Sequence, residues 1–479
     1  MKFRLQKLNR LKEDVGRDRI SELSDDVIIH ILSFLPTLDA VKTVLLRRFG
    51  NLWTLVPTLR FDIYEFQDKM YPDAKWEDYD FGRFYIFIRS VLMLHQSPSV
   101  QIFSLCLAFR SEDEMFKVAD DIKLWLNFAL DKQAKEIIVR HISQGSVDLN
   151  PIPANFTSQS LVILELSCCS IEPQIQVDLG SLKKLLLDHV SLTEKAFQQF
   201  IFGCPSMQEL SIIEPNGMKK VSFNAPNINK FSFVLTDGYD DNDPWVLDFP
   251  NLKTLDLLID RIPHIIDVSS VQVFHLKDIM YEMEEEDDED DPGMFNIFFR
   301  KFLGVKIFQL SCKASEPFLH RLDLIDDLHL LETTWKSLAL ELVLLCDNCL
   351  LGIYRLMRSL KHLEELIIYT TEETTVSSVC STSSLCIHED SEASLYTPPF
   401  ELPSDYVMPK LKTVTLHGLV KPWNRQLQLV EFLLKTAIIL DKLVIAPSKR
   451  VLTEGEELEF VKHVSSFKRA STSARVFFA

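Results

Sequence analysis

The chain has 479 residues, of which 47% are apolar and 25% charged, as expected for a folded protein with more than one compact unit. Its net charge of −18 disfavours nucleic acid as a partner, because phosphate binding depends on an excess of Lys and Arg. No apolar run reaches the roughly 20 residues of a membrane helix, and only 13 glycines are available for phosphate-binding loops.

The cysteines and the N-terminal residues indicate the cellular compartment in which the protein is expected. Nine cysteines at irregular spacings do not form the paired pattern of a secreted disulfide framework, so we expect a reducing cytoplasm or nucleus. The first residues, "MKFRLQKLNRLK", are basic but lack the continuous apolar centre of a secretory signal. We expect residues 1–15 to form a disordered leader; a mitochondrial presequence is the alternative.

Two short amphipathic helices are predicted next. The first starts after Ser24, a good N-cap, and ends before Pro36; the second is capped by Thr37. The apolar stripe of the first consists of Val27, Ile28, Ile31, Leu32 and Leu35. In the second, Val41, Val44 and Leu45 are expected to carry the apolar face, followed by the large side chains of Phe49, Leu52 and Trp53. A unit this small cannot bury all of this apolar surface internally. Either a partner covers the surface, or the helices cap the repeats that follow.

A short phrase of the form apolar-x-x-apolar-x-apolar then recurs along the chain. Six copies between residues 161 and 276 start 21, 25, 21, 24 and 19 residues apart, which is the leucine-rich-repeat period. We expect each phrase to form one strand of a parallel ladder, with its apolar positions facing inward. A few of the 13 matches, mostly outlying ones, are expected to arise by chance. The phrases start at Val100, Ala134, Leu161, Leu182, Met207, Ile228, Leu252, Val271, Val305, Trp335, Leu363, Leu411 and Leu440.

The segments between phrases are predicted to be helices, turns or insertions. One helix is capped by Thr193, presents Phe197, Phe200 and Ile201 at helical spacing, and stops at Gly203. The acidic run at 282–291 is interpreted as a solvated loop, rather than a calcium site or a clamp for a basic partner. The Ser/Thr-rich stretch at 370–394 is interpreted as a flexible excursion.

No motif predicts catalysis, a cofactor or a metal site. GxSxG, HExxH and phosphate-binding loops are missing from the sequence. Cys346 and Cys349 form a CxxC, but no second pair follows at zinc-finger spacing, so buried structural cysteines are expected. The other candidate ligands, Cys380, Cys386 and His388, fall in the Ser/Thr-rich stretch. The histidines that follow or sit within phrases, His189, His275 and His417, are expected to bond to neighbouring loops.

The first helices carry a resemblance to a known family. "DRISELSDDVIIHILSFLPTLDAVKTVLL", followed by "NLW", resembles an F-box over about 45 residues. The C-terminal "MPKLKTVTLHGLVKPWNRQLQLVEFLLKTAIILDKLVI" and "FVKHVSSFKRASTSARVFF" are similar to the FBD domain of plant F-box/FBD/LRR-repeat proteins. The matching F-box positions are Arg19, Ile20, Leu23, Asp25, Val27, Ile31, Leu32, Leu35, Pro36, Ala40 and Trp53.

The sequence departs from the F-box pattern in three places. Ser24 stands where a proline is usual, Leu46 replaces a small polar residue, and Phe49 in "RRFG" replaces a tryptophan. Ser24 remains a good cap, and Phe49 keeps aromatic bulk but lacks an indole N–H. Gly50 would loosen a helix by up to about 1 kcal/mol. The F-box resemblance implies docking on a Skp-type adaptor, and we expect these departures to weaken that docking without abolishing it.

The resemblance implies an α/β protein with a small helical F-box, an irregular leucine-rich-repeat solenoid and a C-terminal FBD region. The expected divisions are a leader at 1–15, the F-box at 16–62, a connecting helical segment at 63–98, repeats at 99–395 and the FBD-like region at 396–479. The implied function is that of a substrate receptor in an SCF-type ubiquitin ligase.

The implied partners are a Skp-type adaptor and, through it, a cullin and a RING subunit, together with an unknown protein client. The positions expected to contact the adaptor are Leu23, Val27, Ile31, Leu32, Leu35 and Pro36. The alternative is a repeat scaffold whose first helices are only a cap. Neither nucleic acid nor a membrane is an expected partner.

Overall fold

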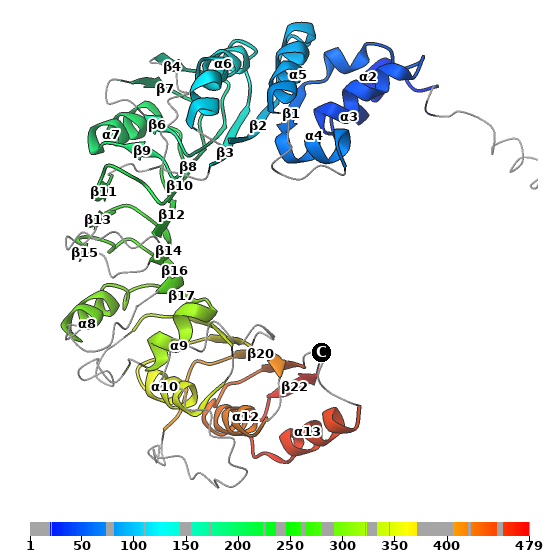
Figure 1. Cartoon of the computed structure of the whole chain (residues 1–479). Helices are drawn as coiled ribbons and strands as arrows, with labels where there is room; N and C mark the ends of the chain where they lie inside the picture. Colours follow the sequence, from blue (N-terminus) through cyan, green and yellow to red (C-terminus); the bar gives the residue numbers. More distant parts are fainter. Residues whose placement is uncertain are drawn as a thin grey trace, which may run out of the picture. The chain divides into compact units, whose positions relative to one another are not determined.

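The structure is a computed structural model in which the chain divides into two compact units, residues 1–218 and 219–479 (Figure 1). It describes residues 20, 22–72, 81–109, 112–143, 155–171, 175–223, 227–235, 246–259, 264–279, 292–320, 322, 333–343, 345–370, 406–419, 423–447 and 454–478. The expected leader, the acidic run at 282–291 and the Ser/Thr-rich stretch beyond Thr370 lie outside these residues.

The first unit combines an N-terminal helical module with a ladder of parallel strands. The module contains α2 (Asp25–Leu32), α3 (Thr37–Lys42) and two short 3₁₀ helices, η1 (Thr43–Leu45) and η2 (Leu52–Leu55). The ladder runs in the order β1 (Thr58–Asp62), β2 (Ile102–Phe109), β3 (Glu136–Ser143), β5 (Ile163–Ser167), β8 (Lys184–Asp188) and β10 (Glu209–Ile213).

Helices and short strands connect the ladder strands of the first unit. Helices α4 (Ile63–Met70) and α5 (Phe81–Leu94) fall in the segment expected to be helical, and α6 (Glu112–Asp131) packs on β2. Helix α7 (Glu194–Gly203) is capped by Thr193 as predicted, through a hydrogen bond from the Ala196 amide to the Thr193 hydroxyl. The short strands form two parallel pairs: β4 (Asn155–Thr157) with β7 (Gln176–Asp178), and β6 (Ser170–Ile171) with β9 (Ser191–Leu192).

The second unit carries its own parallel ladder. It contains β12 (Lys230–Leu235), β14 (Thr254–Ile259), β16 (Val273–Ile279), β17 (Ile307–Leu310), β18 (Ser337–Leu342), β19 (Glu365–Thr370), β20 (Thr413–Leu419), β21 (Lys442–Pro447) and β22 (Arg475–Phe478), each paired with the next. A smaller parallel sheet contains β11 (Lys220–Ser222), β13 (Val246–Asp248) and β15 (His264–Ile265).

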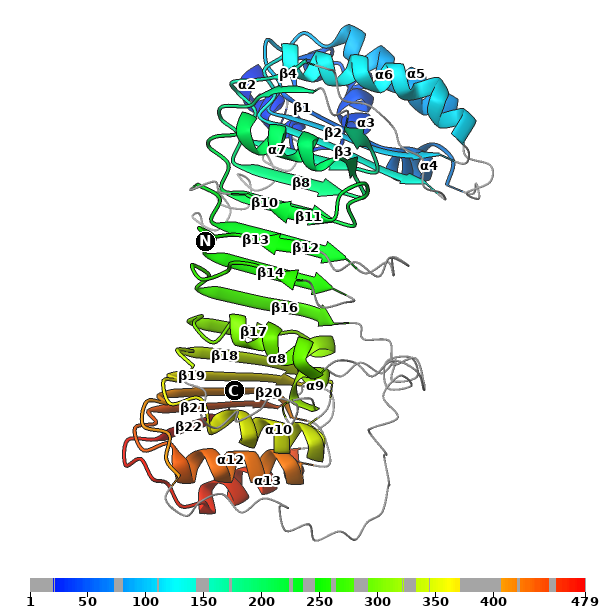
Figure 2. The ribbon, with the colours of Figure 1, turned by 90° about the vertical axis from the view of Figure 1, so that its left-hand side faces the viewer.

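Helices cover one face of the second ladder (Figure 2). Helix α9 packs on β16 and β18, α10 packs on α9 and α12, and α12 packs on α13. We call the opposite face, which these helices leave uncovered, the open strand face. The helices are α8 (Pro292–Lys301), α9 (Cys312–His320), α10 (Asp347–Met357), α12 (Asn424–Thr436) and α13 (Glu454–Ser466).

Every one of the 13 phrases forms a ladder strand, and each strand begins two residues after the first apolar residue of its phrase. The expectation that outlying matches arise by chance is therefore wrong. In every phrase the first, fourth and sixth positions are buried, and the register keeps equivalent positions side by side, as in Leu338 beside Leu366. Each phrase is stabilised by its neighbours, so weak copies at the ends are supported as well as strong ones.

The ladder extends beyond the range expected for the repeats. Strand β1 carries an additional copy of the phrase, in which Val56, Leu59 and Phe61 are buried. Strands β20 to β22 continue the ladder through the range expected for the FBD-like region. The α/β class and the repeat solenoid predicted from the sequence are confirmed.

Candidate functional site: the N-terminal helical module

The module has a small core of its own. Ile28 and Leu32, on the inward face of α2, pack with Val56 just after η2. Partly buried apolar side chains surround this cluster: Leu23, Ile29, Leu35, Phe49 and Leu52. Helix α2 is therefore fixed by its inward face, which leaves its outward face available.

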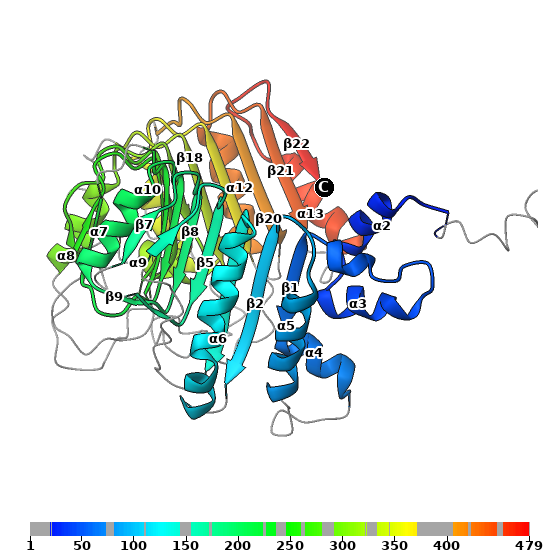
Figure 3. The ribbon, with the colours of Figure 1, turned by 90° about the horizontal axis from the view of Figure 1, so that it is seen from above.

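Polar contacts tie the module together and attach it to the ladder. The Arg48 guanidinium donates to the Leu23 carbonyl oxygen at 2.7 Å and pairs with Asp25 at 2.8 Å. The Thr58 hydroxyl on β1 donates to the Ser33 carbonyl oxygen at 2.7 Å. The Arg60 amide donates to the hydroxyl oxygen of buried Thr37 at 2.7 Å. Figure 3 shows α2 and α3 beyond β1, at the edge of the first unit's ladder.

The outward face of α2 and the turn that follows it present apolar side chains to solvent. Val27 is 43% exposed, Ile31 41% and Phe34 71%, and the three lie at helical spacing. The Phe34 ring contacts His30 edge-on, with 4.9 Å between ring centroids. We call Val27, Ile31 and Phe34 the outward apolar stripe.

The module also exposes apolar residues elsewhere. Val44, Leu45 and Leu46, at and just after η1, are exposed, with Leu45 at 85%. Of 22 large apolar side chains that are exposed among the described residues, eight lie between residues 20 and 55. Scattered exposed apolar residues are normal, but such a concentration in one small module is typical of an interaction surface.

The six positions expected to contact an adaptor fall into two groups. Val27 and Ile31 are exposed, and Leu23, Leu35 and Pro36 are half-buried. Leu32 is only 2% exposed and belongs to the module's own core, so its side chain is not available at the surface. Helix α2 is apolar on both faces, and periodicity alone could not separate the inward residues from the outward ones.

Sequence reasoning missed Phe34 and Leu46 as exposed apolar residues, although Phe34 continues the spacing of Val27 and Ile31. It also assigned the apolar face of α3 to Val41, Val44 and Leu45, whereas the helix buries Leu38 and Ala40. The N-cap of α3 is Pro36 rather than Thr37, and the Thr37 hydroxyl accepts a hydrogen bond from the Arg60 amide.

The departures from the F-box pattern are accommodated locally. Ser24 occupies the N-cap of α2, although its side chain makes no capping hydrogen bond. Phe49 packs against the module core. The expected helix-loosening effect of Gly50 is wrong, because Gly50 lies in a turn with φ of 45°, a left-handed conformation that glycine adopts without strain.

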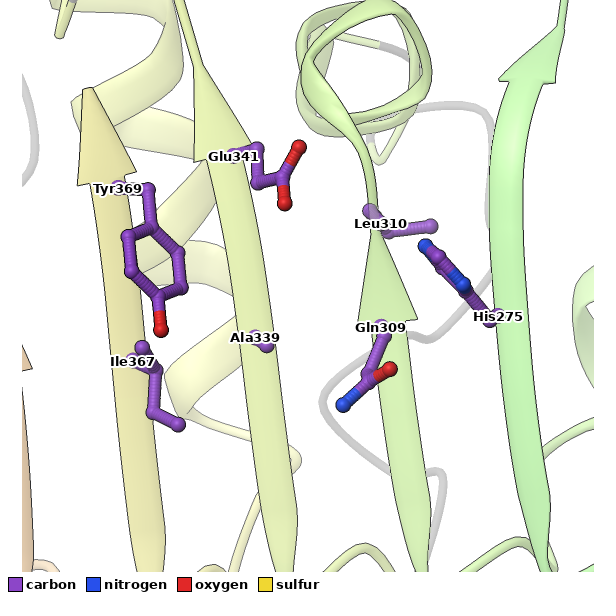
Figure 4. A pocket seen from close by; sticks show the side chains of 7 residues that line it. All are labelled: His275, Gln309, Leu310, Ala339, Glu341, Ile367 and Tyr369. Atoms are coloured by element: carbon purple, nitrogen blue, oxygen red, sulfur yellow. The ribbon is translucent and has the colours of Figure 1, made fainter. Parts of the chain in front are cut away.

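A shallow pocket of about 240 Å³ lies on the open strand face of the second unit. Figure 4 shows its side chains on four neighbouring strands, β16 to β19. Tyr369 also stacks on His417, with ring centroids 4.8 Å apart. Burial lowers the pKa of His275, against the opposing attraction of Asp256. The lining residues are His275, Gln309, Leu310, Ala339, Glu341, Ile367 and Tyr369.

The fold is that of a leucine-rich-repeat solenoid preceded by a small helical module. Residues 122–278 match the family model described as "FBD-associated F-box protein At5g56370, LRR repeats". These findings confirm the resemblance to plant F-box/FBD/LRR-repeat proteins that the sequence indicated. Within the described residues, no helix is both long and apolar enough to cross a bilayer.

Individual relatives come from Arabidopsis thaliana. F-box/FBD/LRR-repeat protein At5g56420 is 29% identical over 53% of this chain and 60% of its own length. F-box/FBD/LRR-repeat protein At4g26340 is 29% identical over 62% of this chain and 66% of its own length. Putative FBD-associated F-box protein At5g56400 is 29% identical over 65% of this chain and 64% of its own length. The chain thus spans slightly less than two thirds of these relatives.

Proposed function

We propose that the chain is a substrate-receptor subunit of an SCF-type cullin–RING ubiquitin ligase. The N-terminal module docks on a Skp-type adaptor, which connects it to a cullin and a RING subunit, and the repeat ladder binds a protein client. The observation that carries the proposal is the outward apolar stripe of Val27, Ile31 and Phe34. The named F-box relatives support the same assignment.

The stripe favours a docking module over a simple cap. A cap turns its apolar face toward the ladder that it covers and its polar face toward solvent. Helix α2 instead buries Ile28 and Leu32 within the module and presents a second apolar face to solvent. When a partner covers apolar area that folding leaves exposed, this area is removed from water, which stabilises the complex.

The mechanism that follows is positioning, which requires no catalytic residue from this chain. Holding a client near a ubiquitin-loaded enzyme raises the effective concentration of its lysines. The pocket on the open strand face offers an imidazole, an amide, a carboxylate and a phenol, on His275, Gln309, Glu341 and Tyr369. Such directional groups on a rigid ladder suit recognition of a protein segment.

The test is capture of a purified Skp-type adaptor by the full chain. We expect the wild type to bind, and Ile31→Asp and Val27→Asp each to weaken binding by at least about 2 kcal/mol, roughly thirtyfold, because a charge would face the apolar interface. The measurement is Kd by calorimetry or surface plasmon resonance.

A matched control is Phe202→Asp, because Phe202 is 90% exposed on α7 in the same unit but outside the module. This variant should bind like the wild type. A double change to Asp at Leu32 and Leu35 is less informative, because Leu32 lies in the module core and its replacement would unfold the module. The proposal fails if the wild type does not bind, or if the stripe variants bind as tightly as Phe202→Asp.

A further inference from the structure

Two cysteines and a histidine from neighbouring helices converge in the second unit. Cys346 is the N-cap of α10, Cys349 lies in the first turn of α10, and His320 is the last residue of α9. The sulfur atoms are 3.1 Å apart, and His320 Nε2 is 3.7 Å from Cys346 Sγ and 3.6 Å from Cys349 Sγ. All three atoms lie within 4.8 Å of one another.

These distances suit a thiophilic cation. With Zn–S bonds of about 2.3 Å and Zn–N bonds of about 2.0–2.1 Å, tetrahedral geometry places ligand atoms roughly 3.5–3.8 Å apart. The two sulfur–nitrogen distances fall in this range, and the sulfur–sulfur distance needs to open by well under 1 Å. Packing of cysteines alone does not require an imidazole nitrogen equally close to both sulfurs.

The fold brings the third ligand close through a glycine in α10. A Cβ atom at Gly352 would lie 2.6 Å from the carbonyl oxygen of Leu319, so no larger residue fits without displacing α9. Leu319 directly precedes His320, and the absence of a side chain at Gly352 therefore lets the end of α9 approach the CxxC. A glycine inside a helix costs about 1 kcal/mol relative to alanine.

The groups around Cys346 favour the thiolate form of this cysteine. Arg425 on α12 makes two hydrogen bonds to Asp347, of 2.6 and 2.9 Å, which place its guanidinium next to the CxxC. Cys346 Sγ accepts a hydrogen bond from the Cys349 amide at 3.3 Å. Cys349 is buried, while Cys346 and His320 are half-buried, so a fourth coordination position would lie on the solvent side.

We propose that His320, Cys346 and Cys349 bind a zinc ion, with water as the fourth ligand. The ion joins the end of α9 to the start of α10, which are consecutive helices on the covered face of the ladder. On binding, the two cysteines coordinate as thiolates, and any thiol proton passes to solvent. The sequence did not predict this site because His320 precedes the CxxC by 26 residues and belongs to no zinc-finger spacing.

The first test is the metal content of the full chain, purified without chelators or a histidine tag. We expect about one zinc per chain in the wild type and less than a tenth of that in Cys346→Ser and His320→Ala. The matched control is Cys106→Ser, which removes a half-buried cysteine in the first unit and should keep its zinc. Circular dichroism checks that each variant is folded.

The second test remains informative if a variant misfolds. Cobalt titrated into the zinc-stripped wild type should give visible ligand-field bands of tetrahedral cobalt and a thiolate charge-transfer band. His320→Cys should keep the metal and intensify the charge-transfer band, because a third thiolate replaces the imidazole. The proposal is overturned if the wild type takes up no stoichiometric zinc, if Cys346→Ser retains it, or if Cys346 and Cys349 form a disulfide in the metal-free protein under reducing buffer.

Discussion

Gly203 shows how a single residue sets the distance between two elements. It is the last residue of α7, and a Cβ atom there would lie 2.3 Å from the carbonyl oxygen of Val177 on β7. Sequence analysis assigned Gly203 only as a helix stop. The structure adds that the helix end lies against the strand backbone, where there is no space for a side chain.

We expect Gly203→Ala to lower the free energy of unfolding by about 1–3 kcal/mol, because the new methyl group overlaps a backbone atom that cannot move freely. Gly455→Ala is the matched control: Gly455 lies in α13, and a Cβ atom there would meet nothing within 4 Å, so alanine should be neutral or stabilise by up to about 1 kcal/mol. Chemical denaturation measures both. Equal effects of the two substitutions would contradict the close approach.

A second residue-scale feature recurs along the first ladder. Cys168, His189 and Glu214 directly follow β5, β8 and β10, and all three have positive φ between 44° and 50°. The amide of Cys168 donates to the Asp188 carbonyl oxygen, and that of His189 to the Ile213 carbonyl oxygen. The amide of His189 thus bonds to the last residue of β10 and its ring contacts Asp188 of β8 at 2.8 Å, so these partners are strand residues and not the neighbouring loop that was expected.

At the scale of elements, a buried hydroxyl on α3 contributes to the attachment of this helix to β1. Thr37→Val should lower the free energy of unfolding by about 1–2 kcal/mol, because the half-buried Arg60 amide loses its acceptor, the buried Thr37 hydroxyl. Hydrogen exchange of amides in α2 and α3 should rise, while exchange in α7 stays unchanged.

The control for this prediction is Thr43→Val, whose hydroxyl donates only to the Ala40 carbonyl oxygen one turn earlier in the chain. This change should be within about 0.5 kcal/mol of neutral. If Thr37→Val is as mild as Thr43→Val, the hydrogen bond to β1 does not hold the module.

Strands were more predictable from the sequence than helix faces. A strand of this ladder needs only three apolar positions at fixed offsets, so even "AKEIIV" at Ala134 identified β3. Strand β1 was missed because its phrase, "VPTLRF", falls within the range assigned to the helical module. Helix α2 is apolar on both faces. Its contacts with η2, which lies further along the chain, decide which of the two faces is buried.

The candidate sites were only partly predictable, because they too depend on contacts between segments that are distant in the sequence. Val27 and Ile31 were identified through the family resemblance, and the structure places both at the surface. Leu32 also matches the F-box pattern, but its side chain faces the module core. His320 joins Cys346 and Cys349 only because α9 packs on α10, which no spacing within one segment indicates.

At the scale of the whole molecule, buried histidines link stability to pH. His95 is 6% exposed, its Nε2 lies 3.0 Å from the Val56 carbonyl oxygen, and burial lowers its pKa below the usual value, helped by the charge of Lys132. Burial likewise lowers the pKa of His141 in the first unit. The unfolded chain therefore binds protons that the folded chain does not.

The fold therefore loses stability as the pH falls. As pH falls below about 6.5, the unfolded state gains protons first, so stability falls, by at most about 1.4 kcal/mol per pH unit for each such histidine. Denaturant titrations of the first unit's unfolding between pH 7.5 and pH 5 should show the loss, and His95→Gln should reduce the slope. A slope unaffected by His95→Gln would contradict the linkage.

The constant two-residue offset between phrase and strand has a practical consequence for engineering. Because the phrase itself fixes where each strand starts, extra chain between one strand and the next phrase need not disturb the pairing. The chain already uses this freedom: β19 and β20 pair as Leu366 with Val414, although the sequence between them is much longer than between other neighbours. Fluorescent labels, affinity tags or protease sites inserted between Thr370 and Tyr406 should therefore leave the strand pairing in place, whereas an insertion next to the buried Met408 would disturb its packing.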